Sequence, residues 1–402
     1  MPTLLVSILF VPFEDLSLQK GSTTHIKELI TVLREKSGYR VTVLTQGKVI
    51  SDLADEFITL GSNPLTGSAL KTGILLPVTL LKILYWLAFY HSRVDVVYTR
   101  SIFVCPLYVL LGVFFLFRRK LIYEANGLSG EERRLKGRTI VNRLVVKFIE
   151  MNESVSMKYS DRIIAVTPRL KCRISKEFSI KKEKIEVIGN GVNLDLFKPM
   201  KDGKKLDGLR RNLEIRSDNR IVCFVGNMAH WQGLEVLVDS ALTISQRNRR
   251  AKFLVVGDGV LRGKIVNKVN RLGLMNRFVF TGMVPYHEVP VFINMADVCV
   301  SPFISERNSA IGLSPLKVFE YMACGKPVVS SNISGLEFMA EERAGLLVAP
   351  DDQEELAHGI LRVLENSELA KELGENGLRL ARSRFAWEAI SKNTKKIIDS
   401  LL

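Results

Sequence analysis

The stretch from Gly312 to Ser330 reads Gly-Leu-Ser-Pro-Leu-Lys-Val-Phe-Glu-Tyr-Met-Ala-Cys-Gly-Lys-Pro-Val-Val-Ser. Its order predicts a loop, a short helix, a turn and a buried strand. Pro315 suits the first helical turn, where its missing N–H costs nothing. Gly325 is a helix-capping residue, and the proline two positions later cannot continue the helix. The stretch therefore predicts one helix-to-strand unit of a parallel α/β sheet.

The start of this short helix is a candidate anion-binding site. A helix N-terminus presents free backbone N–H groups and the positive end of the helix dipole. Lys317 falls in the first turn, where its charge is unfavourable unless an anion lies between it and the dipole. Glu320 follows one turn later, within reach of a polar ligand. The alternative is a surface helix whose charges are only solvated.

The same alternation of β-rich and helical patterns continues along the chain, which predicts two doubly wound parallel sheets. Such sheets bind ligands at the carboxyl ends of their strands. The polar segment 199–207 is the expected linker, so the expected domains are 1–198 and 199–384, followed by a helix at 385–402. A helix is expected from about 24 to 35, and strands at 4–10, 40–45, 95–98, 120–124, 162–166, 185–188, 220–225, 252–256, 278–281, 298–301, 328–330 and 346–348.

Composition limits the class of protein and its partners. The 402 residues are 47% hydrophobic, enough for two packed cores and against wholesale disorder. The net charge of +15 favours anionic partners such as nucleotides or an acidic membrane surface. Nucleic acid is disfavoured, because no zinc pattern or aromatic RNA-binding signature occurs.

The cysteines and histidines give no metal-binding or disulfide pattern. The five cysteines are scattered without any CxxC spacing, which predicts reduced thiols in a cytoplasmic protein. The five histidines are equally dispersed, so we expect no protein-bound metal. Residues 4–10 follow no basic segment, which favours a first strand over a signal peptide.

The Gly312–Ser330 stretch resembles the nucleotide-sugar site of the glycosyltransferase family 4 enzymes. In that family a Glu, seven residues and a second Glu lead into Ala-x-Gly-x-Pro-Val. Glu320 matches the second Glu, which the resemblance assigns to the nucleotide ribose. Gly312 stands where the first Glu falls, which puts the family's usual contact to the donor sugar in question.

The resemblance extends to loops in both halves. Gly21, in Lys-Gly-Ser after the first strand, matches a glycine loop that faces the donor phosphates. In the segment from Phe224 to Gly233, the family has an Arg and a Lys that hold the diphosphate, but this chain has Asn227 and Gln232. A diphosphate still needs charge-assisted donors. Lys317 is the first candidate for the substitute cation and Arg307 the second, with ordinary surface charge as the alternative for both.

Two positions in the first half are candidates for the reacting end of the site. The family often carries a His near Tyr123-Glu-Ala-Asn-Gly127, and Asn126 is closest to that position. Glu124 is either a catalytic carboxylate or a brace for the loop. Val284 matches the position near the nucleobase. The candidate donor-binding residues are thus Gly21, Gly226, Asn227, Gln232, Val284, Arg307, Leu313, Ser314, Pro315, Leu316, Lys317 and Glu320.

The resemblance implies the GT-B fold: two doubly wound Rossmann-like domains facing a cleft, with the C-terminal helix crossing back to the first domain. It implies transfer of a sugar from a nucleotide-diphosphate sugar to an acceptor hydroxyl, with retention of configuration and without a cofactor or metal. Three alternatives stay open: a nucleotide-sugar epimerase of this fold, a nucleotide-sugar-binding protein without turnover, and an integral membrane protein.

Two apolar stretches and one amphipathic, basic stretch raise the question of a membrane. Residues 74–90 and 102–117 are rich in apolar side chains, but the first is interrupted by Pro77 and Lys82 and the second is short for a span. We expect 102–117 to be a buried helix. Residues 74–90 have Tyr85 and Trp86, which suit an interface, and 133–148 combine an apolar and a basic helical face. These features favour peripheral attachment to an anionic membrane and a lipid-linked acceptor, as in polysaccharide assembly.

Overall fold

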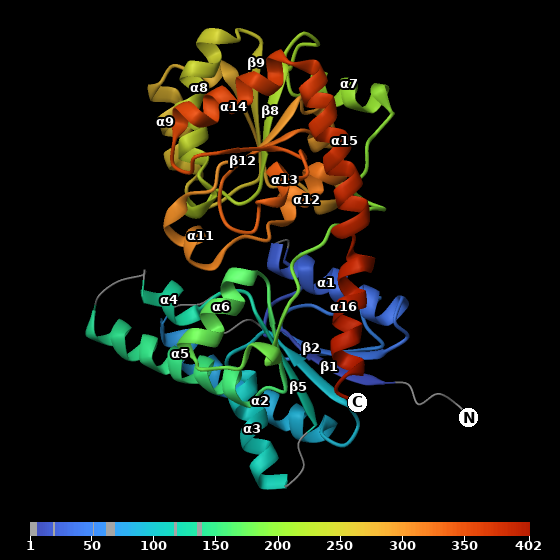
Figure 1. Cartoon of the computed structure of the whole chain (residues 1–402). Helices are drawn as coiled ribbons and strands as arrows, with labels where there is room; N and C mark the ends of the chain where they lie inside the picture. The colour runs from blue at the N-terminus through green and yellow to red at the C-terminus, as the bar shows by residue number, and fades with distance from the viewer. Residues whose placement is uncertain (1–5, 19–20, 51, 62–68, 116–118, 135–138) are drawn as a thin grey trace. The chain divides into compact units, whose positions relative to one another are not determined.

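The computed structural model describes residues 6–18, 21–50, 52–61, 69–115, 119–134 and 139–402 (Figure 1). The chain forms two compact units. Unit 1 is Met1–Gly189 with Trp387–Leu402, and unit 2 is Asn190–Ala386. The sequence-based boundaries lie at 198/199 and 384/385.

Unit 1 contains a parallel seven-stranded sheet in the order β3-β2-β1-β4-β5-β6-β7. The order reverses between β1 and β4, which makes the sheet doubly wound. Its strands are β1 (Ser7–Val11), β2 (Arg40–Thr45), β3 (Glu56–Thr59), β4 (Val96–Thr99), β5 (Lys120–Ala125), β6 (Arg162–Ala165) and β7 (Ile185–Val187). The helices are α1 (Gly21–Glu35), α2 (Ala69–Tyr90), α3 (Val104–Phe115), α4 (Ser129–Arg134), α5 (Ile140–Tyr159), α6 (Pro168–Glu177) and α16 (Trp387–Asp399).

The C-terminal helix α16 belongs to unit 1, as the expected fold requires. It packs on α1 (Figure 1). The Trp387 ring, 2% exposed, meets the His25 ring edge-on, with the ring centroids 5.2 Å apart. The Tyr39 hydroxyl donates to Asp399 at the other end of the helix, 2.5 Å away. The last helix therefore completes the first unit after the chain has passed through the second.

Unit 2 contains a parallel six-stranded sheet in the order β10-β9-β8-β11-β12-β13. Side chains of β8 alternate between two apolar cores, with Cys223 on one face and Phe224 on the other, because the sheet is covered on both sides. The strands are β8 (Arg220–Val225), β9 (Ala251–Val256), β10 (Phe278–Gly282), β11 (Val298–Ser301), β12 (Val328–Ser331) and β13 (Leu346–Val348). The helices are α7 (Gly203–Asn212), α8 (Leu234–Arg247), α9 (Arg262–Arg271), α10 (Val289–Met295), α11 (Ser305–Ile311), α12 (Leu316–Ala323), α13 (Phe338–Glu341), α14 (Gln353–Glu365) and α15 (Ser367–Arg384).

The alternating strand–helix order is confirmed, but several expected limits were wrong. Helix α1 begins at Gly21 and not near 24, and β3 was not expected. The expected linker 199–207 is partly helical, because Asp202 caps α7 by accepting from the Lys205 amide at 3.1 Å. Pro315 is the N-cap of α12 and not its first helical residue. Residues 4–5, Lys20, 116–118 and 135–138 of the expected elements lie outside the described ranges.

Two of the three stretches that raise the question of a membrane differ from expectation. The helix expected at 133–148 is the end of α4 and the first part of α5. Helix α3 is not buried throughout, since Leu110 and Val113 are 48% and 70% exposed. Among the described helices, none is both long and apolar enough to cross a membrane.

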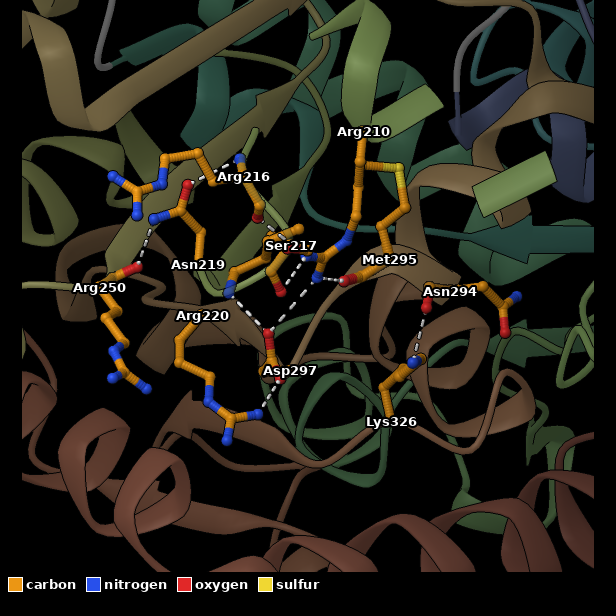
Figure 2. A network of polar contacts seen from close by, with 11 residues as sticks. Arg210, Arg216, Ser217, Asn219, Arg220, Arg250, Asn294, Met295, Asp297 and Lys326 are labelled. Carbon is orange, nitrogen blue, oxygen red and sulfur yellow. Dashed lines mark hydrogen bonds and ion pairs between the residues drawn. The ribbon is translucent and has the colours of Figure 1, made fainter. Parts of the chain in front are cut away.

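An aspartate directly before a strand closes the amino end of the unit 2 sheet. Asp297 precedes β11, and its amide donates to the Ile221 carbonyl at 2.9 Å while its Oδ2 accepts from the Ile221 amide at 2.7 Å. The same carboxylate pairs with Arg220 and Arg210, at 3.0 and 4.0 Å (Figure 2). Among the described residues of unit 1, the equivalent two-bond exchange occurs between Asp55 and Val41, Asp95 and Ser7, and Asp161 and Leu121.

These exchanges satisfy strand amides that would otherwise lack a partner, and they set the register at the amino ends of four strands. The loops at the carboxyl ends are then the ones available to bind a ligand, as in other doubly wound sheets.

We expect Asp297→Ala to lower the free energy of unfolding by about 1–3 kcal/mol, because it leaves a buried amide and two arginines without their shared acceptor. Asp218→Ala is the matched control, since Asp218 forms an exposed pair with Arg216 at 3.0 Å. The control should lose less than about 1 kcal/mol. Urea unfolding of both variants tests this, and equal losses would contradict the proposed role of Asp297.

Candidate functional site

The loop before α12 is held by backbone contacts on two sides. The Leu313 amide donates to the Ser334 carbonyl at 2.7 Å. The Asn190 amide donates to the Ser314 hydroxyl at 2.8 Å, and the Asn190 side chain donates to the Ser314 carbonyl. A Cβ at Gly335 would lie 2.1 Å from the Leu313 carbonyl, so only glycine fits there. The start of α12 is therefore fixed before any ligand binds.

Gly312 ends α11 with φ 73° and ψ 177°, a backbone conformation that residues other than glycine rarely adopt. The family's first Glu falls at this position. A glutamate here would strain the backbone. The local backbone conformation therefore accounts for glycine at this position.

Lys317, Gln232 and Gly226 come together at the start of α12, as the candidate site requires. The Lys317 ammonium donates to Gln232 Oε1 at 2.6 Å and lies 4.0 Å from the centroid of the Phe224 ring. Gly226 has φ +140°, and a Cβ there would lie only 2.8 Å from Lys317 Nζ. The glycine thus makes room for the ammonium beside the end of β8.

The surroundings of Lys317 weaken its hold on its proton. Burial beside the Phe224 and Phe303 rings lowers the pKa of the Lys317 ammonium from 10.5 to about 7, although the charge of Glu320 opposes the change. An anion at the helix start would reverse part of this loss by favouring the charged form. The group is therefore poised to become fully charged when an anion binds.

Glu320 is 5% exposed and lies on the same helix as Lys317. The Tyr286 hydroxyl donates to Glu320 Oε1 at 2.9 Å. Tyr286 follows Val284 by two residues, and both side chains pack against the same apolar core. Sequence reasoning missed Tyr286; the signal was its position two residues after the matched Val284.

Asn227 and Arg307 lie beside this cluster but contact other groups. Asn227 is exposed. Its side chain lies against Gly259, where an added Cβ would be only 2.2 Å from Asn227 Oδ1. The Arg307 guanidinium lies over the Trp231 ring, 5.2 Å from its centroid. Trp231 directly precedes Gln232, so Arg307 lies next to the segment that contacts Lys317.

The unit 1 candidates occupy two different environments. Asn126 follows β5 and is exposed, as is Gly21 at the start of α1. Glu124 is 1% exposed, lies 2.9 Å from His25 Nε2 and 3.2 Å from Arg100 Nε, and accepts from the Tyr98 hydroxyl at 2.6 Å. Burial alone would raise the pKa of Glu124, but His25 and Arg100 outweigh it and hold that pKa well below its usual range. A carboxylate so paired is a poor proton acceptor near neutral pH.

No group of three or more His, Cys, Asp or Glu side chains suited to a metal occurs within the described ranges of the chain.

Two family models match consecutive parts of the chain. The model described as Glycosyltransferase Family 4 matches residues 20–196, and the model described as Glycosyl transferases group 1 matches residues 219–366. A similar curated protein is an uncharacterized glycosyltransferase of Methanocaldococcus jannaschii, 28% identical over 252 residues. That alignment covers 62% of this chain and 63% of the relative, less than two thirds of its length.

Solved structures share the fold over nearly the whole chain. Sucrose-phosphate synthase of Thermosynechococcus elongatus has a TM-score of 0.79 and 23% identity, covering 98% of this chain and 99% of the other. HepE of Anabaena, solved in complex with UDP-glucose, has a TM-score of 0.75 and 18% identity, covering 98% and 99%. At these identities the likeness establishes the GT-B fold alone.

The site predicts a pH dependence for binding of a nucleotide sugar, whose diphosphate diester does not itself titrate near neutrality. If the diphosphate binds at the start of α12, protonated Lys317 attracts it and the neutral amine does not, so affinity should be highest below pH 7 and fall as the pH rises through about 7. The limiting slope is about tenfold per pH unit for one linked proton.

Calorimetric titrations between about pH 6 and pH 8.5 measure this slope, which follows from the titration of one lysine. Lys317→Met should bind more weakly and without the pH dependence. Wild-type affinity that stays constant over this range would contradict the assignment.

Proposed function

We propose that this nucleotide-sugar-dependent glycosyltransferase, a GT-B protein with a family 4 domain followed by a group 1 domain, binds its donor on unit 2 and transfers the sugar with retention of configuration. The observation that carries the proposal is the meeting of Lys317, Gln232 and Gly226 at the start of α12, with Glu320 one turn further along.

The diphosphate of the donor is assigned to the first turn of α12. Leu313, Ser314, Pro315 and Leu316 shape this turn, whose backbone N–H groups and dipole suit an anion. Lys317 supplies the positive charge that Asn227 and Gln232 lack relative to the family pattern, and Arg307 is the reserve cation. Gly226 allows the backbone to approach the phosphates.

The negative charge on the leaving diphosphate grows as the bond to the sugar breaks. An ammonium already held in place by Gln232 and two aromatic rings needs little reorganisation to stabilise that charge. Because the free ammonium has a pKa of about 7, binding of the diphosphate also draws in a proton. Lys317 thus acts by electrostatic stabilisation and not as a base.

Glu320 is assigned to the ribose. A buried carboxylate can accept from two adjacent hydroxyl groups, and Tyr286 orients it through Oε1. The base is assigned to the neighbourhood of Val284, in the same segment as Tyr286. The nucleobase and the sugar are not specified by these contacts.

At the reacting end, Asn126 is the exposed candidate near the transferred sugar. The pairing of Glu124 with three side chains supports the role of a brace over that of a catalytic base. Gly312 removes one carboxylate that related enzymes use on the sugar. That change leaves an epimerase, or a nucleotide-sugar-binding protein without turnover, as alternatives that product analysis with an acceptor would separate.

An apolar face on unit 1 supports peripheral attachment to a membrane. Helix α3 contacts both α2 and α5. These three helices carry a concentration of exposed apolar side chains, interleaved with exposed basic residues that include Lys82, Arg143 and Lys147. The exposed apolar residues are Val78, Leu81, Tyr85, Phe89, Leu110, Val113, Leu144, Phe148, Met151 and Tyr159, which we term the α2–α3–α5 face.

Exposed apolar clusters of this kind mark interaction sites, and the basic residues make an anionic lipid surface the partner that fits. We therefore assign the protein to the inner face of the cell membrane, with a lipid-linked glycan as acceptor, in polysaccharide or glycan assembly.

Thermal shifts test the donor site. The wild type is screened against a panel of nucleoside diphosphates and nucleotide sugars. Ligands that carry one particular base should raise its melting temperature, because a ligand that binds the native state stabilises it. Glu320→Gln should lose most of the shift. Glu375→Gln is the control, since Glu375 is 69% exposed in unit 2. A full shift in Glu320→Gln would contradict the ribose assignment, and turnover with an acceptor would exclude a protein that only binds.

Vesicle sedimentation tests the α2–α3–α5 face. The wild type should bind vesicles of phosphatidylglycerol and phosphatidylcholine, and the triple variant Leu81→Glu, Val113→Glu, Leu144→Glu should bind at least about tenfold less. Val260→Glu is the control, because Val260 is 91% exposed in unit 2. Binding that is equal for the wild type and the triple variant, or a wild type indifferent to vesicles, would rule out this attachment.

A further inference from the structure

A buried arginine joins two segments of unit 1 that the proposed function uses. Arg100 directly follows β4, and its side chain is 7% exposed. Its Nε lies 3.2 Å from Glu124 Oε1, on β5, and its Nη1 donates to the Ser22 carbonyl at 3.0 Å, in the first turn of α1. One rigid guanidinium thus spans from the end of a central strand to the start of a helix.

Glu124 is the centre of this network. Its Oε1 is shared by His25 and Arg100, and its Oε2 accepts from Tyr98. Helix α1 is consequently tied to the sheet at two places, through His25 and through the Ser22 carbonyl. The Trp387 ring covers His25 from α16, which shields the network from solvent.

The Ser22 peptide is held from a further direction. The Ser22 hydroxyl donates to Glu14 Oε2 at 2.7 Å, while its carbonyl accepts from Arg100. Because the peptide group is planar, fixing the Ser22 carbonyl also fixes the direction of the next N–H group. The first turn of α1, which begins at Gly21, is therefore oriented by the side chains of Glu14 and Arg100.

Burial of so many charges is not explained by stability alone. Buried ion pairs often add little net stability compared with apolar residues of similar size, because desolvation offsets their attraction. What the network does provide is geometry: it ties the first turn of α1 to Glu124 on β5, two residues before Asn126.

We propose that Arg100 is a positioning residue for the transfer reaction, acting through the Ser22 carbonyl and Glu124 to set the Gly21 turn and Asn126. The inference rests on the proposed function, which assigns the transferred sugar to the neighbourhood of Asn126. It depends on the planar guanidinium of arginine, which holds Nε and Nη1 at a fixed angle; a lysine ammonium has no such fork.

Kinetics of Arg100→Lys and Arg100→Ala test the proposal, with Arg173→Lys as the control because Arg173 pairs instead with Glu131 and Glu177. We expect kcat of Arg100→Lys to fall by about tenfold or more, while KM for the donor changes by less than about threefold. Added guanidinium ion should restore part of kcat to Arg100→Ala. The control should keep both constants near the wild type.

A second measurement does not depend on activity. Hydrogen exchange of the amides at 21–26 should be faster in Arg100→Lys than in the wild type, and unchanged in Arg173→Lys. Unchanged exchange, or an unchanged kcat in an active enzyme, would overturn the role of Arg100. A wild type that transfers no sugar from any nucleotide sugar would instead overturn the proposed function itself.

Discussion

The parallel arrangement of the strands is the constraint on which both units depend. Amino-end amides of a parallel sheet need partners, and aspartates such as Asp297 and Asp95 provide them through paired bonds to the neighbouring strand. With the amino ends closed in this way, the loops at the carboxyl ends are left to carry ligands. The cluster at the start of α12 and the network around Glu124 both arise where elements leave those ends.

The two clusters handle buried charge in opposite ways. Glu124 is surrounded by His25, Arg100 and Tyr98, so its charge is compensated and its pKa is held low. Lys317 has a neutral amide and aromatic rings around it, so its charge is poorly compensated and its pKa falls to about 7. The first arrangement suits a permanent brace, whereas the second suits a group that waits for an anion.

Much of the fold could be predicted from sequence because both faces of each sheet are buried, which leaves unbroken apolar runs such as β8 between loop signals. The short strand β3 was missed because it lacks such a run. Helix α7, which Asp202 caps, was missed because its polar composition resembles that of a linker. The candidate site could be predicted in part. Lys317, Gln232 and Gly226 were named from their positions in the sequence, and the structure places them next to one another. Tyr286 and Arg100 were not, because their roles depend on contacts 34 and 78 residues away in the chain.

A crystal structure with a bound nucleotide sugar is the most direct test of the donor assignment. The account predicts the diphosphate at the first turn of α12 beside the Lys317 ammonium, with both ribose hydroxyls donating to the Glu320 carboxylate. A nucleotide bound elsewhere on the chain would contradict it. So would a diphosphate at α12 that makes no contact with Lys317, whose ammonium would then donate only to Gln232.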